Sequence, residues 1–204
     1  MVPVMTDRSR CRFCTIVTLA STTVWAMAAM ASAGQGFSRT LKRNDITFAV
    51  SSGSDTSTST VGVTATASAP GQTSKVSREI DGAVTRAEVA DLDGDLAPEV
   101  YVWVQSAGSG SYGSLVGYVA DKQASLSEIA VPSLQSDARL SEGYMGHDEF
   151  RILRTNDLIR RFPLYRPGDS NARPTGGRRT LYYALEREGT GWVLRVARVV
   201  DESR

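Results

Sequence analysis

Polar and apolar residues alternate along much of the chain with the period of two that is typical of β-strands. The clearest example is residues 99–105, where three valines share one face and Tyr101 and Trp103 share the other. The same pattern predicts further strands at residues 46–50, 60–66, 84–92, 115–120, 150–153, 158–165, 180–186 and 192–200. No stretch keeps the 3.6-residue apolar period of an amphipathic helix, so the pattern favours a protein built from strands.

Short turn sequences separate neighbouring predicted strands. A Gly-rich stretch follows residue 105, Thr-Asn-Asp occupies residues 155–157, and Glu-Gly-Thr-Gly occupies residues 188–191. Each is typical of a hairpin connection. We therefore predict an all-β fold: a single-domain antiparallel β-sandwich of about eight strands joined by hairpins.

The first 33 residues have the pattern of a secretory signal peptide. Arg8, Arg10 and Arg12 precede an apolar run, and Ala31-Ser32-Ala33 matches an A-x-A cleavage signal. We expect residues 1–33 to be removed during export, which predicts a periplasmic location. The mature chain is then a single stretch long enough to bury one core.

The mature chain, residues 34–204, is expected to be one domain with two parts of different composition. Residues 34–75 are low in complexity, rich in Ser, Thr, Gly and Ala, and are expected to form weak edge strands, including the strand at 60–66. Residues 76–204 carry most of the large apolar side chains and are expected to form the main β domain.

Cysteine content and charge narrow the classes of partner. Cys11 and Cys14 both lie in the signal segment, so the mature chain folds without disulfides, which suits a bacterial periplasm. The whole sequence has 23 basic and 22 acidic residues, a formal net charge of +1. Because the signal segment contains three arginines and one aspartate, its removal changes the formal net charge from slightly positive to slightly negative. This balance predicts neither nucleic acid nor a membrane surface as partner.

The Gly-rich stretch after residue 105 carries the most distinctive side chains. It contains a Ser-Gly-x-Tyr core made of Ser109, Gly110, Ser111 and Tyr112. Its glycines permit positive φ angles, so we expect a tightly curled loop. The loop offers hydroxyls and one aromatic ring but no acid, base or thiol, which favours recognition of another molecule over catalysis.

The rest of the sequence gives little support to an enzyme. His147 is the single histidine, and no Gly-x-Ser-x-Gly nucleophile motif is present. A pair of carboxylates for glycoside hydrolysis is compatible with the sequence, although nothing in it singles out a pair. We predict that the protein is not an enzyme and needs no cofactor.

An acidic segment supports an alternative function. Asp91, Asp93 and Asp95 alternate along the chain, and Glu99 lies four residues further on. Such carboxylates are hard oxygen ligands for Ca²⁺, and the alternative is a calcium-dependent binding module of the envelope. A tight turn in which the aspartates accept backbone hydrogen bonds explains the same residues without a metal.

This acidic segment departs from an EF-hand loop at two positions. Leu96 stands where a glycine is expected, and Val102 stands where the last glutamate is expected. A shorter calcium turn of the kind found in integrin-like propeller repeats fits better, although such proteins repeat the motif and this sequence contains it once.

Several of these stretches together resemble one known family, the periplasmic inhibitors of invertebrate-type (I-type) lysozyme. They follow one another in order between Ala90 and Trp192. The stretches are Ala90–Asp95, Pro98–Val102, Ser106–Val116, Ser125–Ile129, Gly146–Phe150, Arg160–Pro163 and Pro174–Gly177. The resemblance implies a secreted antiparallel β-sandwich that binds an I-type lysozyme and inserts its Ser-Gly-x-Tyr loop into the active-site cleft.

Carried onto this sequence, the resemblance assigns lysozyme binding to Ser109 and Tyr112, with Gly110 permitting the turn and Ser111 between them. Further contacts are expected from Tyr144, Arg173 and Arg178. A homodimer is also compatible with the sequence, because the face with Tyr101 and Trp103 can pack against a second sheet or a second subunit.

Overall fold

The computed structural model describes residues 36–55, 57–69 and 71–203, and the predicted signal peptide lies outside them. Ala33–Arg204 forms one compact unit. In the described residues, no helix is both long and apolar enough to cross a membrane.

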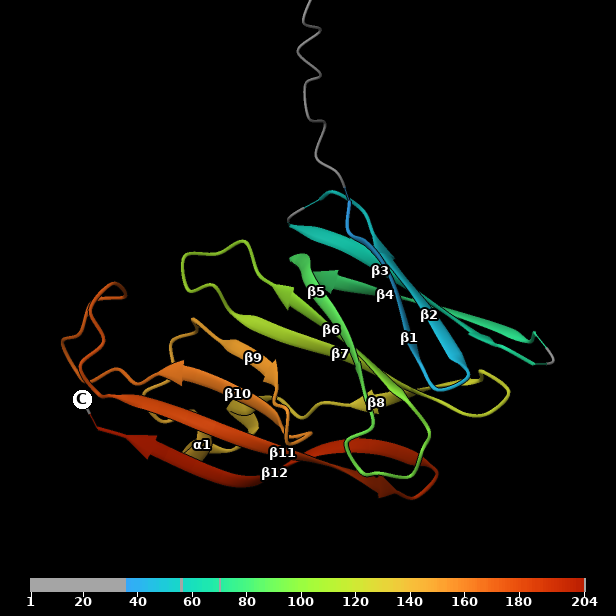
Figure 1. Ribbon diagram of the computed structural model, residues 1–204. Helices are drawn as coiled ribbons and strands as arrows, with labels where there is room; N and C mark the ends of the chain where they lie inside the picture. The colour runs from blue at the N-terminus through green and yellow to red at the C-terminus, as the bar shows by residue number, and fades with distance from the viewer. Residues whose placement is uncertain (1–35, 56, 70, 204) are drawn as a thin grey trace, which may run out of the picture. The chain divides into compact units, whose positions relative to one another are not determined.

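Twelve strands and two short helical turns make up the described part of this unit (Figure 1). The elements, in chain order, are β1 (Ser38–Arg43), β2 (Ile46–Ser52), β3 (Thr58–Ala67), β4 (Thr73–Asp81), β5 (Ala83–Ala90), β6 (Glu99–Gln105), β7 (Gly113–Ala120), β8 (Leu126–Ala130), η1 (Leu134–Ser136), α1 (Ala138–Ser141), β9 (Glu149–Ile152), β10 (Leu158–Pro163), β11 (Arg178–Glu188) and β12 (Gly191–Glu202).

The strands form two sheets. The smaller sheet has the order β1-β2-β3-β4 and the larger has the order β5-β6-β7-β8-β12-β11-β10-β9. Among the described strands, β8 and β12 pair in parallel and all other neighbours pair antiparallel. The all-β prediction is confirmed, but the expectation of about eight strands, all antiparallel, is corrected to twelve strands with one parallel pair.

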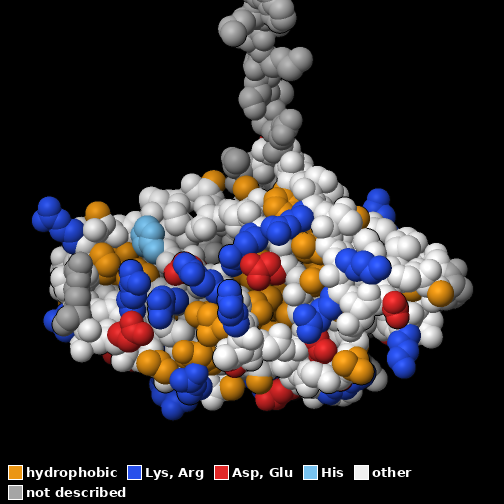
Figure 2. Space-filling model, viewed as in Figure 1, with side chains coloured by type: hydrophobic (Ala, Val, Ile, Leu, Met, Phe, Trp, Pro, Cys, Tyr) orange, Lys and Arg blue, Asp and Glu red, His pale blue; other side chains and the backbone are white. Residues whose placement is uncertain are grey.

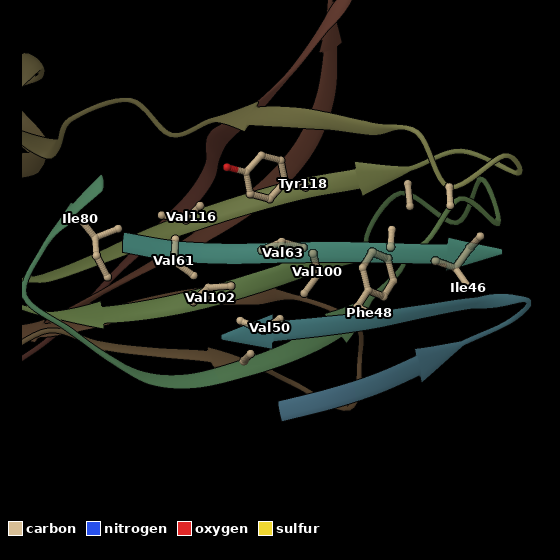
Figure 3. Close-up of a cluster of buried hydrophobic side chains, with 14 of the residues drawn as sticks. Ile46, Phe48, Val50, Val61, Val63, Ile80, Val100, Val102, Val116 and Tyr118 are labelled. Carbon is tan, nitrogen blue, oxygen red and sulfur yellow. The ribbon is translucent and has the colours of Figure 1, made fainter. Parts of the chain in front are cut away.

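The smaller sheet packs against the β5–β7 part of the larger one. Phe48 and Val63 from the smaller sheet lie in one buried cluster with Val100, Val102 and Val116 (Figure 3). The valine face of β6 is therefore the face that meets the second sheet, as expected for a period-two pattern buried between layers.

The opposite face of β6 is also buried. Tyr101 and Trp103 belong to a second apolar cluster with Leu158, Leu181 and Leu194, from β10, β11 and β12. The far strands of the larger sheet thus cover this face within the same chain. A second subunit does not use it, so any homodimer needs another surface.

The strand predicted at 60–66 does not lie at an edge. It is β3, which pairs with β2 on one side and β4 on the other. The prediction of an edge strand is wrong. Ala65 in this strand is fully buried in the cluster that joins the smaller sheet to β5–β7, so the lack of large side chains here does not mean a lack of packing.

Three strands were not predicted: β1, β4 and β8. All three are largely polar and exposed; β4 and β8 have one buried residue each, Ile80 and Ile129. A strand that pairs through its backbone but exposes most side chains has little apolar alternation to detect. β4 also runs across residue 75, so the boundary expected between residues 75 and 76 falls inside a strand of the smaller sheet.

Candidate functional site

The Ser-Gly-x-Tyr core lies in the loop that joins β6 to β7. Two backbone bonds close this loop: Ser106 N–H donates to the Tyr112 carbonyl at 2.9 Å, and Ser111 N–H donates to the Gly108 carbonyl at 2.9 Å. Side chains add two more, because the Ser106 hydroxyl accepts from Tyr112 N–H at 3.0 Å and Gln105 Nε2 donates to the Ser111 carbonyl at 2.5 Å. The loop is therefore folded by its own hydrogen bonds.

The positive φ angle that the turn requires falls on Ser111, at +44°, and not on the loop glycines. Gly110 is needed for a different reason. A Cβ atom there would lie 2.4 Å from the Tyr112 ring, far inside van der Waals contact. The expectation that Gly110 permits the turn through positive φ is thus corrected: Gly110 permits the tyrosine ring to fold back over the backbone.

Two neighbouring segments fix the loop from outside. His147 N–H donates to the Gly110 carbonyl at 2.8 Å, and Asn171 Nδ2 donates to the Ser109 carbonyl at 2.8 Å. The Asn171 amide oxygen lies 3.1 Å from His147 Nε2, which joins these two anchors to each other. The carbonyls of Ser109 and Gly110 are thus both bound by neighbouring segments of the chain.

The close approach of His147 depends on the residue before it. Gly146 is buried, has φ +92°, and a Cβ there would lie 2.0 Å from the Gly110 carbonyl oxygen. Only glycine allows two backbones to meet at this distance.

The two residues assigned to binding are exposed at this loop. Ser109 is exposed and Tyr112 keeps 44% of its surface accessible. Neither hydroxyl makes a hydrogen bond to any part of the chain that the structure describes. The loop therefore has two unused hydroxyl groups on a backbone that is held in place.

Tyr144 supports the Tyr112 ring from beneath. The two rings meet edge to face, with centroids 5.7 Å apart, and Tyr144 packs in the same way on Phe162 at 4.8 Å. The structure thus places Tyr144 beside the loop, half-buried, as a support for the exposed ring.

A buried polar network lies under this aromatic pair. Asp148 accepts from Arg160 Nε at 2.6 Å, from the Tyr144 hydroxyl at 2.6 Å and from Gly113 N–H at 2.8 Å. Arg160 Nη2 also lies 2.7 Å from the Tyr144 hydroxyl oxygen. The Asp148 side chain is fully buried and that of Arg160 nearly so. The network ties the start of β7 to β10.

Protonation states follow from this burial. Burial raises the pKa of the Tyr144 hydroxyl well above its ordinary value; Arg160 opposes the shift and Asp148 adds to it. Burial lowers the pKa of the Arg160 guanidinium, but the adjacent Asp148 carboxylate has the stronger, opposite effect. The pKa of Arg160 therefore lies above its ordinary value. Tyr144 therefore stays a neutral donor, and Arg160 stays charged.

The sequence did not identify Asp148, Arg160 or Asn171 as site residues. Asp148 and Arg160 occur in stretches that carry the family resemblance, which is the one signal that pointed to them. Their roles are not apparent from the sequence because charged residues are usually solvated. Only the pairing of β9 with β10 brings the two together.

The two arginines expected as further contacts are both exposed. Arg173 lies in a turn closed by its own N–H to the Ser170 carbonyl, two residues beyond the anchor Asn171. Arg178 begins β11 and lines a surface hollow that His147 and Arg161 also line. On the face shown in Figure 2, basic side chains gather in a band, with apolar and acidic side chains among them.

The acidic segment forms the connection between β5 and β6. One carboxylate oxygen from each of Asp91, Asp93, Asp95 and Glu99 lies within 4.8 Å of the others. Several of these carboxylates also accept backbone hydrogen bonds, as the metal-free interpretation expects. Asp95 accepts from Ala97 N–H at 2.8 Å. Glu99 accepts from Leu92 N–H at 2.8 Å.

Leu96, which stands where a glycine was expected, has φ +70° and is 74% exposed. A leucine in this left-handed region costs about 1–2 kcal/mol, whereas glycine adopts it freely. We expect Leu96→Gly to raise the free energy of unfolding by about 0.5–1 kcal/mol in urea denaturation, after the larger backbone entropy of glycine is subtracted. Ser77→Gly, at an exposed position within β4, is the control and should lower stability. A less stable Leu96→Gly variant would contradict the strain.

The fold and the site together define an all-β protein that presents a fixed, uncharged hydroxyl loop where β6 joins β7 in the larger sheet. Neither a scan against protein-family models nor a search of curated proteins finds a match. A search of solved structures finds similarity to the crystal structure of PliI-Ah, the periplasmic lysozyme inhibitor of I-type lysozyme from Aeromonas hydrophyla. The identity is 30%, the match covers 46% of this chain and 85% of that chain, and the TM-score is 0.42. This is a partial similarity that leaves more than half of the present chain unaligned.

Proposed function

We propose that this protein inhibits an I-type lysozyme by placing residues 109–112 in the enzyme's active-site cleft. The observation that carries the proposal is the state of the loop. His147 and Asn171 hold its carbonyls, while the hydroxyls of Ser109 and Tyr112 have no partner in the described chain. The motif resemblance noted in the sequence supports the choice of target.

The chemistry of the loop suits such a cleft. A retaining glycosidase of the lysozyme type uses two carboxyl groups, one ionised and one protonated. A hydroxyl can donate to the ionised group and accept from the protonated one. The loop brings no charge that either group would repel, and it has no glycosidic bond to cleave.

The fixed loop also reduces the cost of binding. Loop ordering and side-chain immobilisation oppose association, and a loop already held by internal hydrogen bonds avoids much of that loss. Tyr112 adds a large contact area with few rotatable bonds, and Tyr144 already restricts the position of its ring.

The exposed Arg173 and Arg178 complement this role at longer range. Basic groups around a binding loop attract an acidic cleft and chiefly increase the rate of association. In this proposal the arginines guide the approach, and the loop makes the contacts that block the substrate.

The proposal carries further expectations about where and how the protein works. It implies export through the segment at residues 1–33 and action in the periplasm, with a protein partner and without nucleic acid or membrane. It assigns no catalytic residue and no turnover. A homodimer stays a prediction, with a surface other than the Tyr101 and Trp103 face.

A titration tests the proposal directly. We expect purified residues 34–204 to abolish the lytic activity of an I-type lysozyme at a ratio near one to one, measured by clearing of a bacterial cell-wall suspension. A chicken-type lysozyme assayed in parallel reports selectivity. Full I-type activity at a large excess of this protein would refute the proposed function.

A further inference from the structure

The acidic connection between β5 and β6 has more carboxylates than the neighbouring basic side chains neutralise. Four carboxylates converge there, from Asp91, Asp93, Asp95 and Glu99. The one ion pair that the described residues provide is Arg43 Nη2, 4.0 Å from Asp91, and Arg43 is partly exposed. The excess of carboxylates favours a bound cation at this place.

One of these carboxylates also has a buried oxygen atom without a hydrogen-bond partner. Asp91 is 6% exposed, and its Oδ1 has no partner within the described residues. A buried oxygen left without a donor costs about 1–3 kcal/mol, and more when it is charged. Glu99 is 0% exposed, and the Tyr101 hydroxyl is its neighbouring donor. The Asp91 oxygen is an observation independent of the clustering, and it calls for a positively charged group at this place.

The donor set selects the kind of ion. All four candidate ligands are carboxylates, with no imidazole or thiolate, which is the set that hard divalent cations prefer. Four carboxylates from the protein suit calcium better than Mg²⁺, because Mg²⁺ usually keeps several waters and binds through one or two carboxylates.

We propose that Asp91, Asp93, Asp95 and Glu99 bind one calcium ion in the β5–β6 connection. Backbone carbonyls of the turn and water complete the six to eight oxygen ligands that calcium takes. The site is separate from the Ser-Gly-x-Tyr loop and does not depend on the proposed inhibition of lysozyme.

The position of this turn indicates what the ion does. Asn44, from the β1–β2 turn, donates to the Leu96 carbonyl at 3.2 Å, and Asn156, from the β9–β10 turn, donates to the Asp91 carbonyl. The acidic turn thus contacts turns from both sheets. A calcium ion within it stabilises the place where these three connections meet.

Calorimetric titration of the chelator-treated mature protein with CaCl2 at pH 7.5 tests the site. We expect one ion per chain with a dissociation constant of about 10⁻⁴–10⁻³ M, the range of extracellular calcium modules, and a higher Tm in 10 mM CaCl2 than in chelator. MgCl2 at the same concentration should give a clearly smaller shift. No heat and no change in Tm with calcium would overturn the proposal, as would equal shifts with both ions.

Variants at the two exposed ligands keep the test sharp, because they leave the buried groups intact. Asp93→Asn and Asp95→Asn should each weaken calcium binding at least tenfold while the protein remains folded in chelator. Asp121→Asn is the matched control. Asp121 caps Gln123 and Ser125 in the exposed β7–β8 turn, outside the cluster, and its variant should bind calcium like the original protein. Unchanged binding in both ligand variants would place the ion elsewhere and refute the assignment.

Discussion

Replacing Ser109 and Tyr112 together by alanine is expected to abolish inhibition of an I-type lysozyme and to leave the Tm almost unchanged. Both side chains are exposed, and their hydroxyls have no partner in the described chain, so the fold loses little. In the complex they fill a desolvated cleft. Side chains at the centre of an interface contribute about 2–4 kcal/mol each, so the pair weakens binding by at least about a thousandfold.

Two measurements check this result: inhibition titration of the double variant and thermal unfolding without lysozyme. Ser127→Ala, at an exposed position of β8, serves as the control and should inhibit like the original protein. Unchanged inhibition by the double variant would contradict the assigned contact residues. A large fall in Tm would show instead that the two side chains support the fold.

Asp148→Ala is expected to lower the free energy of unfolding by about 3–5 kcal/mol, the range measured when one partner of a buried ion pair is removed. The variant leaves the Arg160 charge buried among Tyr144, Phe150 and Phe162. It also removes the acceptor of Gly113 N–H at the start of β7. For a domain of this size the loss corresponds to a fall in Tm of about 6–20 °C.

Urea denaturation of Asp148→Ala measures this loss. Glu149→Ala is a closely matched control, because Glu149 is the next residue and pairs with Arg151 on the surface. An exposed pair contributes about 1 kcal/mol or less, so this variant should differ little from the original protein. If the two variants lose the same stability, Asp148 does not hold the network as described.

The accuracy of the strand predictions follows from burial. The segment at 99–105 was predicted with the bounds of β6, and those at 46–50 and 180–186 lie within β2 and β11. Each has an apolar face that the period of two makes visible. β1 and β4 were missed because they bury few side chains, and their place in the smaller sheet comes from backbone pairing, which leaves no side-chain pattern.

The candidate site likewise has some residues that the sequence reveals and others that only the folded chain brings in. Ser109 and Tyr112 could be found from the sequence because the loop combines glycines, hydroxyls and an aromatic ring, and because neighbouring stretches resemble one family. The anchors could not be found in this way. His147 and Asn171 reach the loop from positions 37 and 62 residues away from their partners, through contacts that only the folded chain creates.

By itself, the sequence determined that the chain is built from strands, that residue 105 is followed by an uncharged hydroxyl loop, and that acidic residues gather before β6. Local periodicity and composition are enough for such statements. The tertiary structure decided which of these features are held in place. Asp148 and Arg160 look like ordinary surface charges in the sequence. They become a buried pair because β9 and β10 lie side by side, and burial turns a weak surface interaction into one that the fold depends on.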